Sequence, residues 1–317
     1  MHSSGSKTKD MSSGVLSSKY IKETAQRLGF SHCGLAPAEP VDEAFMAHYE
    51  QWLREGKQGE MHYMENHLAI RRDPRLLLPG AKTVVSLAMS YNPGSSETQK
   101  GIAWYAQGRD YHEVIKERLR QLIAQVPRVR ICVDTAPIME KYWAWRCGLG
   151  WIGRHTQFVI PHEGSAFFLA EILVTMEADV YDEPIYDTPY HAGCKGCRRC
   201  LDACPTKAIS EHGMDARRCL SYLTIEYRGD LPEEVKPYLD ECFYGCDRCL
   251  RACPHLATNE ASPVDDFRPS SALLAMMPED WSRLSVEEYR SLFRGSAVKR
   301  AKFAGLQRNI AAMHSQD

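Results

Sequence analysis

The sequence lacks the marks of a membrane or secreted protein. None of its apolar runs approaches the roughly 18 uninterrupted residues that would predict a membrane-spanning helix. The first 14 residues are rich in Ser and Gly and have no apolar core, so they do not form a secretory signal. We therefore expect residues 1–14 to be a disordered leader and the protein to be cytoplasmic, with no membrane partner.

An excess of positive charge is also lacking. Lysine and arginine together number 39 against 41 aspartates and glutamates, which gives a formal net charge of −2. A nucleic acid must therefore bind to local basic patches, because the chain as a whole does not attract polyanions. The content of hydrophobic residues, 44%, is ordinary for a globular protein.

Cysteine, by contrast, is abundant: the chain has 12, nine of them between residues 192 and 260. In a reducing compartment this density favours metal binding over disulfides. Four follow the bacterial ferredoxin pattern C-x2-C-x2-C-x3-C with a proline after the last, and a partial second run also ends in Cys-Pro. The runs are Cys194, Cys197, Cys200 and Cys204 with Pro205, and Cys246, Cys249 and Cys253 with Pro254.

The two runs predict two [4Fe–4S] clusters, because the fourth cysteine of such a run binds the other cluster. The first cluster is assigned Cys194, Cys197, Cys200 and Cys253, and the second Cys204, Cys246 and Cys249. The last ligand is Cys219 or Cys242. We prefer Cys219, since Cys242 is one residue too early for the repeat and the arginines before Cys219 favour a thiolate. Two zinc sites are the alternative, but a double run ending in Cys-Pro favours iron and sulfur.

Apolar patterns elsewhere predict an α+β fold with three parts. Residues 15–190 form a mixed α/β domain with a central sheet, 191–260 a two-cluster ferredoxin-like domain, and 261–317 a short helical C-terminal segment. Strands are predicted at 83–91, 129–135 and 167–175, and helices at 15–28, 113–126 and 137–147. Because clusters carry electrons and do not transform a substrate themselves, we expect the substrate chemistry in the first domain.

Asp134 is the candidate catalytic residue of that domain. It closes a predicted strand and precedes a predicted helix, a common place for catalytic groups. Aspartate at such a position also caps helices, so both roles stay open. Nearby, Gly148, Gly150 and Gly153 spell G-x-G-x-x-G. This motif follows a predicted helix and not a strand, so we interpret it as a tight turn and not as a dinucleotide site.

Several segments together resemble the epoxyqueuosine reductase family along nearly the whole chain. The ferredoxin run is shared by many proteins, whereas Arg217-Arg218-Cys219 followed by residues 221–226 is far more specific. Other matching segments are 108–112, 134–137, 148–151, 244–247 and 308–311. The chain departs from the family at residues 253–256, which read Cys-Pro-His-Leu where the family has Cys-Pro-Trp-Asn.

The resemblance implies an enzyme that reduces epoxyqueuosine in a tRNA anticodon loop to queuosine, the last step of queuosine biosynthesis. It implies a monomer with a cobalamin between the first domain and the ferredoxin-like domain, Asp134 as the proton donor, and Cys219 as the fourth ligand of the second cluster. An acid that works near neutral pH needs a raised pKa, which burial of Asp134 against the corrin face could supply. The residues expected to contact the cobalamin are Asp134, Gly153, Ser221, Tyr244 and Gly245. A low-potential donor of flavodoxin or ferredoxin type would supply electrons.

Basic residues near the end of the chain predict the tRNA contact. Between residues 294 and 308 there are five basic residues and no acidic one, a composition that suits phosphate neutralisation. The predicted contacts are Lys299, Arg300, Lys302 and Arg308, and the alternative is a solvated helix face. Three other functions stay open: a double-cluster electron carrier, another corrinoid-dependent reductase, and a zinc-stabilised RNA-binding module.

Overall fold

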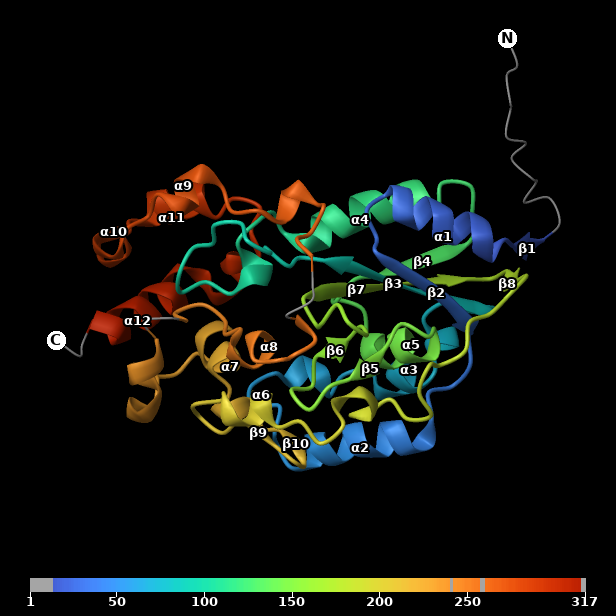
Figure 1. The fold of residues 1–317 in the computed structure, drawn as a ribbon, viewed down its shortest axis with the longest axis horizontal. Helices are drawn as coiled ribbons and strands as arrows, with labels where there is room; N and C mark the ends of the chain where they lie inside the picture. The colour runs from blue at the N-terminus through green and yellow to red at the C-terminus, as the bar shows by residue number, and fades with distance from the viewer. Residues whose placement is uncertain (1–13, 240–241, 257–259, 315–317) are drawn as a thin grey trace, which may run out of the picture.

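The computed structural model describes residues 14–239, 242–256 and 260–314, so the predicted leader lies outside the described residues except for Gly14. A sheet domain, a module rich in cysteine and a group of C-terminal helices follow one another along the chain (Figure 1). The predicted α+β fold class is confirmed. Within the described ranges, no helix combines the length and the apolar composition needed to traverse a bilayer.

The centre of the first domain is an antiparallel sheet of four strands. In spatial order these are β2 (His32–Pro37), β3 (Thr83–Ser90), β7 (Phe167–Val174) and β4 (Val129–Cys132). Strands β3 and β7 pair over their full length, from Thr83 opposite Val174 to Ser90 opposite Phe167. Three strands match the predicted runs, whereas β2 was not predicted.

Helices cover both faces of this sheet (Figure 1). On one side, α1 (Ser18–Arg27) and α4 (Tyr111–Leu122) pack on Val85, Leu87 and Met89. On the other, α2 (Glu43–Arg54), α3 (Leu68–Arg72) and α5 (Glu140–Arg146) pack against Val84 and Ala88. Successive side chains of a strand point to opposite faces, so one apolar run contributes side chains to both core layers.

The cysteine-rich module is built from short elements. They are α6 (Arg199–Asp202), β9 (Ile209–Ser210), β10 (Gly213–Met214), α7 (Leu220–Ile225) and α8 (Arg248–Arg251). Helices α6 and α8, one from each cysteine run, lie against each other. The hairpin of β5 (Trp151–Ile152) and β6 (Phe158–Val159) joins the module to the first domain, because Trp151 stacks edge-on against His255 at 4.9 Å.

The C-terminal segment forms α9 (Ser271–Leu274), α10 (Pro278–Arg283), α11 (Val286–Leu292) and α12 (Lys302–His314). Their apolar side chains share a core with Ile102, Ala106, Phe243 and Tyr244, which come from both preceding parts. The segment therefore holds the molecule together. At the other end, residues predicted to begin a helix form β1 (Val15–Leu16), which pairs in parallel with β8 (Glu177–Ala178).

Candidate iron–sulfur and catalytic site

The first group of thiols unites residues distant in sequence. The charge of Cys194 acts on both Cys200 and Cys253, and that of Cys197 acts on Cys253. These are the four cysteines that the spacing assigned to the first cluster. Burial raises the pKa of Cys200 to about 11, so the thiolates must form as iron displaces their protons.

The second group consists of Cys204, Cys219, Cys246 and Cys249, whose charges likewise act on one another. Cys242 also lies beside the group: a hydrogen bond with Cys242 is the largest influence on the Cys246 thiol, while the Cys242 thiol donates to the carbonyl oxygen of Tyr238 at 2.9 Å. Cys219 lies near three of the thiols, Cys204, Cys246 and Cys249, and its role as the fourth ligand stays a prediction. The electrostatic reason given for it is wrong: Arg217 pairs with Asp215 at 2.7 Å, and burial raises the pKa of Cys219 to about 11.

The second group is joined to the first domain through backbone hydrogen bonds. Tyr244 donates its N–H to the carbonyl of Gly101 at 2.9 Å and accepts from the N–H of Ala103 at 2.8 Å. The next residue, Gly245, has a φ of +73°, and a Cβ there would lie 2.6 Å from that of Ala103, so only glycine fits. Asp247, one residue beyond Cys246, accepts the N–H of Trp104 at 2.7 Å.

Asp134 lies in the loop after β4, with a side chain that is 58% exposed. Its Oδ2 accepts the Tyr111 hydroxyl at 2.9 Å and lies 3.2 Å from Nε2 of His112. Tyr111 in turn packs edge-on against Tyr105, which lies beside Gly245 and Tyr244. Because α5 begins only at Glu140 with Met139 as its N-cap, the helix-capping role for Asp134 is wrong.

The protonation of this site differs from the expectation. Burial would raise the pKa of Asp134, but the hydrogen bonds from His112 and Tyr111 outweigh it and leave the pKa below its usual value. Burial likewise opposes the charging of His112, yet the carboxylates of Asp110 and Asp134 raise its pKa to about 9. In the protein without a corrin, Asp134 therefore lacks the raised pKa, because His112 holds the proton, and the rise expected from burial against a corrin face stays a prediction.

Two further carboxyl groups lie beneath this pair, and the sequence did not single them out. Oε1 of Glu140 accepts the backbone N–H of Asp134 at 2.6 Å. Burial, aided by the nearby Asp134 carboxylate, raises the pKa of Glu140 to about 8. Glu171 on β7 is fully buried, accepts from Ser86 at 3.0 Å, and has a pKa well above the usual range because of burial. Near neutral pH, Asp134 is thus the ionised member of a stack of acids.

The residues expected to contact a cobalamin are only partly brought together. Gly245 lies at the junction of the two domains, next to Tyr105. Tyr244 is fully buried and donates its hydroxyl to the carbonyl of Ala297 at 2.7 Å, which gives it a structural role. Gly153 lies in the β5–β6 hairpin beside His155, and Ser221 in the first turn of α7.

The predicted tRNA-contact residues fall into two kinds. Lys299, Arg300 and Lys302 are exposed, and Arg300 is bound in bidentate fashion by Glu226 at 2.7 and 2.8 Å. Arg308 instead donates to the carbonyl oxygens of Leu223, Tyr227 and Gly229 and to Oδ1 of Asn309, at 2.6–3.1 Å. Its donors are thus used within the protein, which corrects its assignment to RNA binding.

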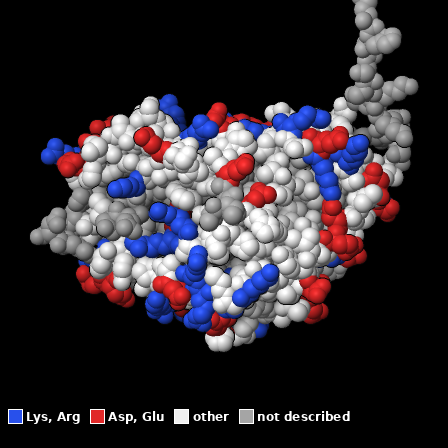
Figure 2. Space-filling view, viewed as in Figure 1, with Lys and Arg blue, Asp and Glu red and all other residues white. Residues whose placement is uncertain are grey.

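More positive charge lies over the cysteine-rich module. Figure 2 shows lysine and arginine side chains gathered over the part of this face where α6, α7 and α8 lie in Figure 1. Exposed arginines of the module include Arg198, Arg199, Arg217, Arg218 and Arg251. Arg198 forms an ion pair with Glu211, so part of this charge is neutralised.

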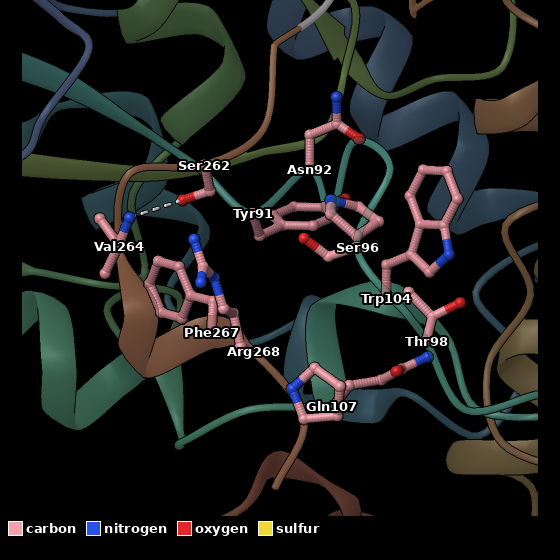
Figure 3. Close-up of a pocket in the computed structure, with 12 residues that line it drawn as sticks. Tyr91, Asn92, Ser96, Thr98, Trp104, Gln107, Ser262, Val264, Phe267 and Arg268 are labelled. Carbon is pink, nitrogen blue, oxygen red and sulfur yellow. Dashed lines mark hydrogen bonds between the residues drawn. The ribbon is translucent and has the colours of Figure 1, made fainter. Parts of the chain in front are cut away.

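A small cavity lies near the second thiol group, between the segments 91–107 and 262–269 (Figure 3). The rings of Tyr91, Trp104 and Phe267 line it, with Ser262 and Gln107 among the polar groups. Burial raises the pKa of Tyr91 far above its usual value, and the charges of Asp247 and Cys249 add to this, so the cavity adjoins the second thiol group. Its volume of about 20 Å³ admits a water molecule and no part of an organic cofactor.

Comparison with known proteins agrees with this arrangement. A family model described as "Epoxyqueuosine reductase QueG, DUF1730" matches residues 71–135, and a "4Fe-4S double cluster binding domain" matches residues 193–256. All eight cysteines of the two groups lie in the second range. The fold and the double-cluster module define an iron–sulfur oxidoreductase.

Similarity to curated proteins narrows the class. An epoxyqueuosine reductase of Cellulophaga algicola is 40% identical over 92% of this chain and 96% of its own length. The Escherichia coli enzyme is 36% identical over 92% of this chain and 79% of its own. The chain belongs to the epoxyqueuosine reductase family.

Solved structures agree. An epoxyqueuosine reductase crystallised with an epoxyqueuosine-modified tRNA stem loop matches with a TM-score of 0.82 and 26% identity, over 93% of this chain and 80% of that one. The Bacillus subtilis enzyme, at a TM-score of 0.79 and 26% identity over the same shares, is described with the catalytic loop that carries its own aspartate swung out of the active site.

Proposed function

We propose that this protein reduces epoxyqueuosine in a tRNA anticodon loop to queuosine, with electrons that pass singly through two [4Fe–4S] clusters. One observation carries the proposal. The main chain of Tyr244, two residues before Cys246, is hydrogen bonded to the segment 101–103, and Tyr105 just after it packs against Tyr111, which donates to Asp134. The second cluster and the acid thus belong to one site. Membership of the family supports the choice of substrate. Because the substrate is a tRNA, the reaction takes place in the cytoplasm.

The first cluster would be held by Cys194, Cys197, Cys200 and Cys253, and would be the entry point for electrons. Its loop is at the surface, with Lys195, Gly196 and Arg199 exposed. A low-potential flavodoxin or ferredoxin, which carries acidic residues, would dock on these cations. The second cluster would be held by Cys204, Cys219, Cys246 and Cys249 at the junction, and would supply single electrons there.

Unpaired polar atoms at another part of the boundary between the two domains would suit a cobalamin. Nε1 of Trp151 and Oγ of Ser165 are buried, and neither has a hydrogen-bond partner among the described residues. Both lie at the boundary of the two domains, since Trp151 contacts His255 and a Cβ on Gly164 would lie 2.9 Å from Leu256. Buried polar atoms without partners are costly, so they suit a bound polar ligand. Bound cobalamin would supply two-electron reducing power at an epoxide carbon.

Removal of the epoxide oxygen as water consumes two electrons and two protons and leaves a carbon–carbon double bond. His112 and Asp134 relay the first proton, and water supplies the second. Because Asp134 is ionised, His112 first transfers the proton on Nε2 to Oδ2 of Asp134, 3.2 Å away, and the carboxyl that this forms then protonates the epoxide oxygen. Tyr111 orients the carboxyl through its hydroxyl.

The test is turnover under anaerobic conditions. Protein with both clusters, cobalamin and a chemical reductant is incubated with tRNA that contains epoxyqueuosine, and queuosine is measured by mass spectrometry. We expect turnover, and a loss of at least about 100-fold in Asp134→Asn. Cluster absorbance should be unchanged in that variant. A protein that cycles its clusters but leaves the epoxide intact would instead be an electron carrier.

A further inference from the structure

Three parts of the chain meet beside Asp134. Tyr63 comes from the first domain, Glu226 from the residue after α7, and Arg300 from the segment before α12. The guanidinium of Arg300 lies over the Tyr63 ring, 5.5 Å from its centroid. Arg300 and Tyr63 both interact electrostatically with the Asp134 carboxylate. This assembly therefore borders the proposed catalytic acid.

Both flat groups are open to solvent. Tyr63 is 45% exposed, and the side chain of Arg300 is 53% exposed. Glu226 is only 18% exposed, so it lies behind the guanidinium. An exposed ring beside an exposed cation is the arrangement on which proteins stack unpaired bases.

The contacts of Arg300 leave the flat face of its guanidinium for stacking, whereas the edge is already hydrogen bonded. Nε and Nη2 both donate to Glu226, so the edge that would clamp a phosphate is already bound. Arg228 holds the backbone beneath, because its Nη2 donates to the carbonyl of Arg300 at 3.0 Å. On the other side, Nη2 of Arg71 donates to the carbonyl of Tyr63 at 3.3 Å.

We propose that Tyr63 and Arg300, with Glu226 as a clamp, form a platform on which an unpaired anticodon-loop base next to the modified nucleotide stacks. This rests on the proposed function, since it takes the loop of the substrate tRNA as its ligand. Stacking on the platform splays the neighbouring base and presents the modified one to Asp134. Lys299 and Lys302, as exposed point charges, neutralise the phosphates.

Binding of an anticodon stem-loop RNA to the holoprotein tests this, with 2-aminopurine at the loop position beside the modified base. Stacking quenches 2-aminopurine. We expect wild type and Tyr63→Phe to quench it, and Tyr63→Ala and Tyr63→Leu to lose the quenching and about tenfold in affinity. The slope of affinity against salt should stay unchanged in these variants. Arg300→Lys, which keeps the charge and loses the plane, should weaken binding in the same way.

The lysines provide the contrast. Lys299→Gln with Lys302→Gln should reduce the salt slope while quenching persists in the RNA that is bound. Tyr63→Ala that binds and quenches like wild type, in a protein that still reduces the epoxide, would overturn the platform and leave the proposed function standing. A wild-type protein that neither binds the stem-loop nor reduces the epoxide would overturn the proposed function itself.

Discussion

The sheet domain and the cysteine-rich module are stabilised by different means. Strands β3 and β7, with eight residues each, lie between two layers of apolar side chains. In the module, α6 and α8 have four residues each, and two of the five residues in the core cluster around them, Cys200 and Cys204, are proposed cluster ligands. The other core cluster of the module, around α7, packs against two more of the proposed ligands, Cys219 and Cys246. The first domain has a core of its own, whereas the module depends on its iron.

Removal of iron should therefore separate the two regions. With a chelator under anaerobic conditions, amides at 192–256 should lose several kcal/mol of protection, because cluster bonds replace a core there. Those of β3 and β7 should keep theirs. Hydrogen exchange followed by mass spectrometry measures both regions in one sample, and equal loss in β3 would contradict the comparison.

Single cysteines sharpen the comparison within the module. Cys219→Ser should lower the iron content from about eight to about four atoms per chain and abolish turnover, because one [4Fe–4S] cluster loses a ligand. Cys242→Ser is the matched control and should keep all its iron, since the Cys242 thiol donates to Tyr238. Iron and sulfide analysis measures both. The reverse result would make Cys242 the ligand.

In the sheet domain, the interaction of His112 with the carboxylates of Asp110 and Asp134 contributes a stability that depends on pH. The His112 pKa is raised from about 6.5 in an unfolded chain to about 9. Its stabilisation is therefore complete below pH 6.5 and is lost as the pH rises through 9. Wild type should exceed His112→Gln in free energy of unfolding by up to about 3 kcal/mol at pH 6, and by little at pH 10. A constant difference would show that the pair does not titrate.

The smallest expected effect concerns the contact between α12 and the cysteine-rich module. Arg308→Lys should lower the free energy of unfolding by about 2 kcal/mol, because it leaves carbonyls of the module without donors. Affinity for the stem-loop should not change. Lys299→Gln should do the opposite, with weaker RNA binding and unchanged stability. Thermal melts and binding titrations distinguish the two variants.

The sequence predicted those features that depend on short stretches of the chain. Seven of the eight proposed cluster ligands follow from spacing within two short runs, whereas Cys219 lies outside both, and β3 and β7 follow from long apolar runs. Strand β2 was missed because its sequence, His-Cys-Gly-Leu-Ala-Pro, contains Gly and Pro and no β-branched residue. Its pairing with β3 is a tertiary effect.

The catalytic environment could be predicted less well. Asp134 stood out at the end of a strand, but its partner His112 lies 22 residues away in sequence. The segment 108–112 was noted as a family match, which was the available signal. The role of Arg308 was misjudged because composition cannot tell a solvated cation from one that binds carbonyl groups.

The hydrogen bonds of Tyr244 to Gly101 and Ala103 have a consequence for the rate of electron delivery. Electrons tunnel between centres, and tunnelling rates fall steeply with separation. Main-chain hydrogen bonds, and not a hinge, fix the distance between the second thiol group and the first domain. Each electron should therefore cross the same distance at every turnover. The transfer step should then be insensitive to solvent viscosity, and any slow motion in the cycle should belong to the RNA.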